Sequence, residues 1–292
     1  MTRIIERLDD ISDRYDALFV DLWGCLHDGY RPFPDAVAAL ERFKSGGGKV
    51  VLLTNSPRPR AAVIRQLEKI GVPRATWDDI ASSGDSAQAG MMRGAVGRHV
   101  YHMGPPVDES FFADTADDIT DEVGITRVPL TEAEGIVCTG LEDDETETPE
   151  DYRAQLLYAK NAGMKLLCAN PDIVVDRGDK RIFCAGALAQ LYTEMGGKSL
   201  YFGKPHPPIY DLARRRLRAL DGPVDESRIL CMGDGIATDI QGATGENLDS
   251  LFISGGLARA ETGTDRQPDP DRLEAYLAEA QQSPDYSIGH LR

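Results

Sequence analysis

The chain has 292 residues, of which 41% are hydrophobic and 27% are charged, so it can bury a sizeable core and is not expected to be disordered. Its formal net charge of −16 argues against a nucleic-acid partner and against docking on an anionic membrane. No apolar run approaches the roughly 20 residues of a membrane-spanning helix. The N-terminus lacks the apolar stretch of a secretory signal, so we expect a cytoplasmic protein.

The predicted elements alternate between apolar strands and amphipathic helices along most of the chain. Continuous apolar runs, typical of strands buried on both faces, occur at residues 17–20, 50–53, 200–202, 229–232 and 251–253. Apolar residues three or four apart predict helices around residues 37–43, 63–70 and 209–220, and a last helix near 273–277. This alternation predicts an α/β fold with a parallel sheet covered on both faces.

The middle of the chain interrupts this rhythm with strand-like runs of its own, at residues 100–103, 135–138 and 165–168. An acidic run at 142–151 is predicted to be a solvated loop that leads into a helix. We therefore predict that residues 88–198 form a separate α/β domain inserted into a core made of residues 1–87 and 199–292.

The five cysteines are expected to be small buried hydrophobic residues, because their number is odd and none forms a close pair with metal-ligand spacing. They are Cys25, Cys138, Cys168, Cys184 and Cys231.

Polar side chains collect where the predicted core strands end. Asp21, Thr54, Lys204 and Asp234 each follow a different apolar run. In an open α/β sheet the ligand crevice lies beyond the carboxyl ends of the strands. We therefore expect these four side chains to converge on one crevice.

The types of these residues suit phosphoryl chemistry near a metal. Asp234 and Asp239 frame a glycine turn and could hold Mg²⁺, or could be capping groups of a strand-to-helix turn. Asp21 could act both as a nucleophile and as a metal ligand, or could simply begin a turn. The hydroxyl of Thr54 could hold oxygens of a transferring phosphoryl group, and Lys204 could neutralise its charge.

Taken together, the order Asp21, Thr54-Asn55, Lys204 and Gly233-Asp234 through Asp239 resembles the four motifs of the haloacid dehalogenase superfamily. The insertion lies between the second and third motifs. That position, together with Asn170-Pro171-Asp172, is similar to subclass IIA, which has a large α/β cap of the C2 type and includes sugar, nucleotide and phosphoglycolate-type phosphatases. The resemblance extends from about residue 15 to residue 257.

The resemblance implies a Rossmann-like parallel-sheet core with the inserted domain as its cap. It implies that Asp21 attacks phosphorus and becomes an aspartyl-phosphate, while Thr54 and Lys204 steady the phosphoryl oxygens. Phosphoryl transfer depends mainly on positioning and electrostatic stabilisation. The substrate would be a small phosphorylated metabolite, and caps of this size suggest a homodimer.

The metal implied by the resemblance is Mg²⁺. Its ligands would be the Asp21 carboxylate, the backbone carbonyl of Trp23 and Asp234, with Asp239 supporting the water shell of the ion.

Substrate-binding residues are expected in two segments. Asn55 and Ser56 follow the second core strand, and Asn170 and Asp172 end a cap strand that the resemblance places near the active site.

One position departs from the resembling phosphatases. They carry a second aspartate two residues after the nucleophile, as general acid and base, and here that residue is Trp23. An indole N–H cannot exchange a proton usefully at neutral pH. Three hypotheses follow: a phosphatase that uses a good leaving group or a substitute acid such as His27 or Asp28, a non-catalytic sensing or phosphometabolite-binding protein, and a 2-haloacid dehalogenase.

Overall fold

Two large parallel β-sheets organise the chain in the computed structural model, which describes residues 2–113, 123–178 and 180–292. The larger sheet has the strand order β1-β14-β13-β12-β2-β3-β4, and every pairing in it is parallel. Its strands are β1 (Arg3–Ile4), β2 (Ala17–Val20), β3 (Lys49–Thr54), β4 (Asp79–Ser82), β12 (Ile229–Gly233), β13 (Asp249–Ile253) and β14 (Tyr286–Ile288).

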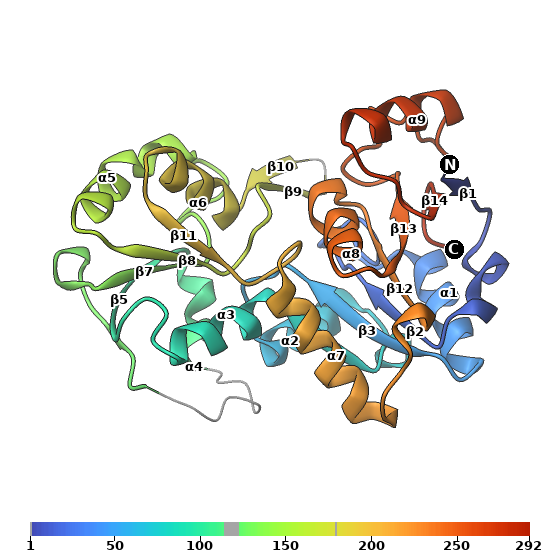
Figure 1. Cartoon of the computed structure of the whole chain (residues 1–292), viewed down its shortest axis with the longest axis horizontal. Helices are drawn as coiled ribbons and strands as arrows, with labels where there is room; N and C mark the ends of the chain where they lie inside the picture. Colours follow the sequence, from blue (N-terminus) through green and yellow to red (C-terminus); the bar gives the residue numbers. More distant parts are fainter. Residues whose placement is uncertain (1, 114–122, 179) are drawn as a thin grey trace.

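Helices cover both faces of this sheet, and both chain ends lie at its β1–β14 edge (Figure 1). The helices are α1 (Pro34–Ser45), α2 (Arg60–Ile70), α3 (Ser83–Met92), α7 (Pro207–Asp221), α8 (Gln241–Gly245) and α9 (Pro270–Glu279). Local sequence explains their ends: α1 begins with a proline, which suits the first helical turn. Helix α2 stops at Gly71, whose φ of 85° is the left-handed conformation that favours glycine.

The central strands are buried on both faces, as their continuous apolar character predicts. In β2, Leu18 and Val20 pack in the same apolar cluster as Leu40 of α1. The intervening Phe19 packs on the opposite face with Leu212 of α7. This two-sided burial fixes the strand ends, and therefore the site beyond them, on a rigid layer.

The second sheet has five strands in the order β11-β8-β7-β5-β6, and the pairings among them are parallel. Its strands are β5 (His99–Met103), β6 (Thr126–Arg127), β7 (Gly135–Cys138), β8 (Lys165–Cys168) and β11 (Lys198–Tyr201). It is accompanied by α4 (Ser110–Ala113), α5 (Arg153–Asn161) and α6 (Ala185–Glu194). We call this part, with its own apolar core, the cap.

A short antiparallel hairpin, β9 (Val174–Arg177) and β10 (Lys180–Phe183), extends from the cap toward the core (Figure 1).

The α/β prediction and most predicted elements are confirmed, including the helices around residues 37–43, 63–70, 209–220 and 273–277. One predicted strand belongs to a different sheet than expected. The strand expected at 200–202 in the core sheet is β11, which pairs with β8 in the cap sheet. The predicted domain limits at 87/88 and 198/199 stay predictions, and α3 and β11 each extend across one of them.

The cysteine prediction is confirmed, since all five thiols are buried and free. Within the described ranges, the helices include none that combines the length and the apolar character needed to cross a bilayer.

Candidate active site

Three adjacent core strands deliver the first site residues. Strands β12, β2 and β3 are neighbours in the sheet, and their carboxyl ends lead into Asp234, Asp21 and Thr54. The parallel register therefore brings these side chains to one edge of the sheet, as expected. All three are buried.

Lys204 reaches the same place from the other sheet. It follows β11 of the cap, and its backbone is held by Asn55: the Lys204 N–H donates to Asn55 Oδ1 over 2.7 Å, and Asn55 Nδ2 donates to the Lys204 carbonyl over 3.1 Å. Its side chain is only 2% exposed. Its Nζ lies 2.6 Å from both Asp21 Oδ1 and Asp239 Oδ1. A single ammonium group therefore bridges two of the buried carboxylates.

Asp239 comes from a π-helical turn, Ile236–Ile240. Its second oxygen, Oδ2, accepts a hydrogen bond from the Gly235 N–H over 3.1 Å. The turn therefore fixes the carboxylate that faces Lys204.

Burial raises the pKa values of the clustered carboxyl groups. Desolvation is the largest effect on each: it raises the pKa of Asp21 and of Asp234 above the usual range, and it raises the pKa of Asp239 to about 6. Lys204 opposes the shift in each case. Three mutually repelling buried acids with one lysine are costly to hold ionised. A cation between them would offset that cost.

The donor atoms near Asp21 fit a hard cation. Ligand atoms of Asp21, Cys25 and Asp234 lie within 4.8 Å of one another. Desolvation, reinforced by Asp234 and Asp21, raises the pKa of the Cys25 thiol well above its usual value, and thiol sulfur is a soft ligand that suits Zn²⁺ or Cu⁺ better than Mg²⁺. The remaining oxygen donors suit Mg²⁺.

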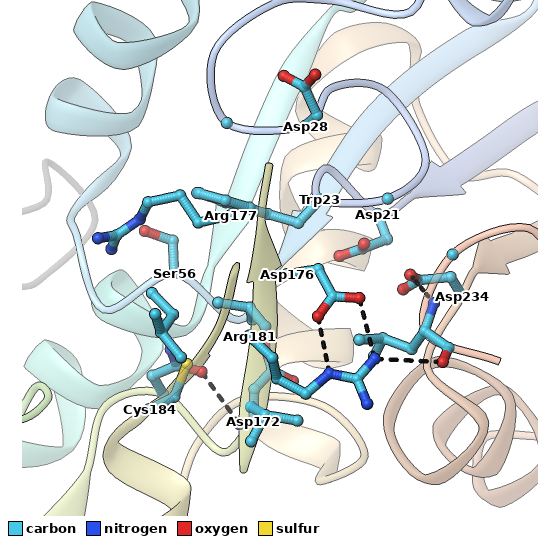
Figure 2. Close-up of a pocket in the computed structure, with 18 of the residues that line it drawn as sticks. Asp21, Trp23, Asp28, Ser56, Asp172, Asp176, Arg177, Arg181, Cys184 and Asp234 are labelled. Atoms are coloured by element: carbon cyan, nitrogen blue, oxygen red, sulfur yellow. Dashed lines mark hydrogen bonds and ion pairs between the residues drawn. The ribbon is translucent and has the colours of Figure 1, made fainter. Parts of the chain in front are cut away.

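Two glycines shape the space around Asp234. A β-carbon on Gly24 or on Gly256 would lie 2.2 Å or 1.9 Å from Asp234 Oδ2. Asp234 Oδ2 also accepts a hydrogen bond from the Leu257 N–H over 3.0 Å. Figure 2 shows the carboxyl groups of Asp21 and Asp234 pointing toward the same space.

Trp23 lines the pocket beside Asp21. Its ring lies edge-on to His27, with centroids 5.3 Å apart, and a β-carbon on Gly29 would lie 2.5 Å from it. The backbone at Gly29 therefore packs so closely against the indole ring that a larger residue would not fit there.

Neither expected substitute acid is placed to serve the site. His27 has no exposed surface, its Nδ1 accepts from the Gly29 N–H, and burial lowers its pKa to about 4. Asp28 points away from Asp21 (Figure 2) and accepts hydrogen bonds from the N–H groups of Tyr30 and Arg31. Although desolvation opposes it, these bonds lower the pKa of Asp28.

The expected substrate-binding residues divide into two groups. Ser56, Asn170 and Asp172 line the pocket. Asp172 Oδ1 accepts a hydrogen bond from Asn55 Nδ2 over 2.8 Å. Desolvation raises the pKa of Asp172 to about 6. Asn55 is absent from the lining, and both ends of its amide bond within the protein. Its place in the structure is that of a link between Lys204 and the cap.

The pocket between core and cap has a volume of about 1100 Å³. The β9–β10 hairpin forms part of its wall, and sequence reasoning missed it. Arg177 pairs with Asp144 within 2.6 Å, and Arg181 pairs with Asp176 within 2.8 Å. Apolar pairs on both sides of Gly178 are the signal that could have indicated this hairpin.

Comparisons with known proteins agree with this geometry. A family model described as "Haloacid dehalogenase-like hydrolase" matches residues 18–116, and a second HAD-hydrolase-like model matches residues 201–280. A haloacid dehalogenase-like hydrolase from Brucella suis is 41% identical, with a TM-score of 0.86 over 99% of this chain and 100% of that one.

Two more distant relatives carry names of defined activity. A 5'-nucleotidase from Bacillus subtilis is 24% identical over 91% of this chain and 97% of its own length. A glycerol phosphate phosphatase from Mycobacterium tuberculosis, solved in complex with magnesium, is 26% identical, with a TM-score of 0.62 over 85% of this chain and 70% of that one. With a full-length relative at 41% identity and a cap sheet between the second and third motifs, the chain belongs to the haloacid dehalogenase-like hydrolase family, in the subclass with a large α/β cap.

Proposed function

We propose that the protein is a Mg²⁺-dependent phosphatase that hydrolyses a small phosphorylated metabolite through an aspartyl-phosphate on Asp21. The observation that carries the proposal is the position of Lys204, whose ammonium group lies 2.6 Å from Asp21 and from Asp239 at the strand ends. The activities named for the 5'-nucleotidase and the glycerol phosphate phosphatase support it.

Mg²⁺ would be held by Asp21, the Trp23 carbonyl and Asp234, with Asp239 supporting its water shell. When bound, the ion supplies positive charge to the phosphoryl oxygens and offsets repulsion among the buried carboxylates. The oxygen donors and the glycine-bounded space beside Asp234 fit such an ion.

The protein groups then have distinct roles. An Asp21 oxygen attacks phosphorus, and the bond to the leaving oxygen breaks. The Thr54 hydroxyl and the Lys204 ammonium group hold the phosphoryl oxygens and stabilise their charge. The Asn55 amide fixes the Lys204 backbone, and Ser56, Asn170 and Asp172 contact the rest of the substrate. Hydrolysis of the aspartyl-phosphate by water restores Asp21.

The test is phosphate release from a panel of phosphomonoesters and acyl phosphates, with Mg²⁺ and with a chelator. We expect release that requires Mg²⁺ and that disappears in Asp21→Asn, because an amide is neither a nucleophile nor an anionic ligand. Asp16→Asn is the matched control, since Asp16 pairs with Arg228 at an exposed position and its loss should leave activity unchanged.

Other outcomes would select the remaining hypotheses. Release that persists in Asp21→Asn would contradict the proposal. If no substrate of the panel releases phosphate, but Mg²⁺ with a phosphate analogue stabilises the protein against heat, the protein would be a binding or sensing protein. Halide release from 2-haloacids in the presence of chelator would indicate a dehalogenase.

A further inference from the structure

The departing oxygen of a phosphomonoester must leave either protonated or as an anion. An alkoxide is a poor leaving group, so alkyl phosphates need a proton donor, and a positioned general acid typically contributes about 10²–10⁴-fold in rate. An acidic hydroxyl compound leaves as a stable anion without one. Whether the pocket suits alkyl phosphates or phosphates of acidic hydroxyl compounds therefore depends on whether a proton donor lines it.

Most carboxyl groups in the described part of the pocket wall already have another partner. Asp21 and Asp239 face Lys204, and Asp234 accepts from the Leu257 N–H. Three more are paired with arginines from the same wall: Asp108 with Arg58, Asp144 with Arg177, and Asp176 with Arg181. Exposed titratable side chains also line the pocket, namely Glu142, Asp143, Glu261 and His290. Pairing with a guanidinium group favours the ionised form of a carboxyl group, although burial raises the pKa of Asp108.

Asp28, His27 and Asp172 remain to be considered as proton donors. Asp28 accepts two backbone hydrogen bonds and points away from Asp21. His27 has no exposed surface and is absent from the lining. Asp172 accepts a hydrogen bond from Asn55, but burial raises its pKa to about 6, so a direct test must exclude this carboxyl group as the donor.

The same pocket has an apolar wall. Val107 and Phe183 of the cap are 63% and 37% exposed and both line the pocket. Trp23 and Phe33 line it from the core, and Trp23 follows Asp21 by two residues. Large apolar side chains exposed inside a cavity favour an apolar ligand group.

We infer that the preferred substrates are phosphates with an acidic, apolar leaving group, either aryl phosphate monoesters or aroyl phosphates, whose oxygen departs as an anion against the apolar wall. This inference rests on the proposed function. In the first step, an Asp21 oxygen forms a bond to phosphorus, and the leaving oxygen takes the electron pair of the broken P–O bond. In the second, water cleaves the aspartyl-phosphate to carboxylate and dihydrogen phosphate, which keeps both protons of the water.

The experiment compares substrates of equal size but different leaving-group acidity. Phenyl and cyclohexyl phosphate carry six-membered rings, but phenol is far more acidic than cyclohexanol. We expect kcat/KM for phenyl phosphate to be larger by about 10² or more, the usual contribution of a missing acid. We also expect it to rise steeply along a series of phenyl phosphates with more acidic phenols. Equal rates for the two rings would overturn the inference.

Variants test the cause of this dependence. Trp23→Asp introduces a carboxyl group beside Asp21 and should reduce the ratio of kcat/KM for phenyl phosphate to kcat/KM for cyclohexyl phosphate, which we call the gap. Trp23→Phe should leave this ratio as it is in the unmodified protein. Asp172→Asn should leave the gap unchanged. A gap that widens in Asp172→Asn would identify Asp172 as the acid and contradict the inference, as would an unchanged gap in folded Trp23→Asp enzyme.

A separate pair of variants tests whether the apolar wall binds the leaving group. Phe183→Ser should raise KM for phenyl and benzoyl phosphate several-fold more than for acetyl phosphate, because acetyl phosphate lacks the ring. Leu157→Ser is the matched control: Leu157 is exposed and does not line the pocket. Equal effects on all three substrates would contradict an apolar subsite, and comparison of phenyl with benzoyl phosphate separates the aryl and aroyl classes.

Failure of the inference and failure of the proposed function give different results. If Asp21-dependent phosphate release occurs without regard to leaving-group acidity, only the inference fails. If no substrate in the series is hydrolysed, the proposed function fails with it.

Discussion

Gly256 determines how closely the backbone approaches Asp234. A β-carbon there would lie 1.9 Å from Asp234 Oδ2, so any larger residue must displace that carboxylate. Asp234 is also a proposed ligand of the metal. The requirement for glycine is therefore a requirement of the site and not of a turn.

We expect Gly256→Ala to lower metal-dependent phosphatase activity by about 10²-fold, because a displacement of about 1 Å at a catalytic centre can have an effect of that size. Thermal stabilisation by Mg²⁺ should decrease in parallel. The control is Gly245→Ala, where the added β-carbon meets no atom within 4 Å. Calorimetry with and without Mg²⁺ measures the effect, and equal stabilisation of both variants would show that Asp234 tolerates the change.

The site residues that could be predicted are those fixed by strand ends. Asp21, Thr54 and Asp234 follow buried apolar strands, and the position of parallel strand ends is a general property of the fold. Contacts across the pocket could not be predicted in this way. The links from Asn55 to Lys204 and Asp172 depend on how the cap sits on the core, which no local pattern encodes.

At the scale of elements, buried strands and long helices were predictable because their apolar periods are strong. The sheet to which a strand belongs could not be predicted in the same way. The apolar run at residues 200–202 overlaps β11 (Lys198–Tyr201), which pairs with β8 in the cap, since position in the chain does not determine hydrogen-bonding partners. The β9–β10 hairpin was missed because its strands are short and carry charged residues over the pocket.

Asp85 joins three helices beneath the site. Its Oδ2 lies 2.6 Å from Arg216 of α7, and its Oδ1 accepts from the Arg60 N–H at the start of α2. Asp85 itself lies in the first turn of α3, where its N–H donates to the N-cap Ser82. The side chains of the Asp85–Arg216 pair are only 1% and 8% exposed, so either charge would be costly alone.

We expect Asp85→Ala to lower the free energy of unfolding by about 3–5 kcal/mol, because it leaves a buried guanidinium group without its carboxylate. Asp16→Ala is the control, since the Asp16–Arg228 pair is half-exposed and such pairs are worth at most about 1 kcal/mol. Urea denaturation followed by circular dichroism measures both values. A similar small loss in both variants would mean that Arg216 finds compensation elsewhere.

At the scale of the whole molecule, a net charge of −16 opposes the approach of a phosphate dianion. The cations of the pocket do little to reverse this field, because Lys204, Arg58, Arg177 and Arg181 each contact a carboxylate. Arg259 also lines the pocket and lies 4.0 Å from the exposed Asp265. Attraction is therefore expected mainly in the immediate surroundings of the proposed metal site. Over longer distances the substrate meets a repulsive potential, whose range is set by the ionic strength.

Added salt should therefore increase kcat/KM. The Debye length decreases from about 30 Å at 0.01 M to about 8 Å at 0.15 M ionic strength, which screens the repulsion, and we expect a rise of about threefold or more over that range. Steady-state rates at saturating Mg²⁺ in two different salts of equal ionic strength separate screening from ion-specific binding. A decrease in both salts would mean that the arginines at the pocket, despite their carboxylate partners, attract the substrate more strongly than the acidic surface repels it.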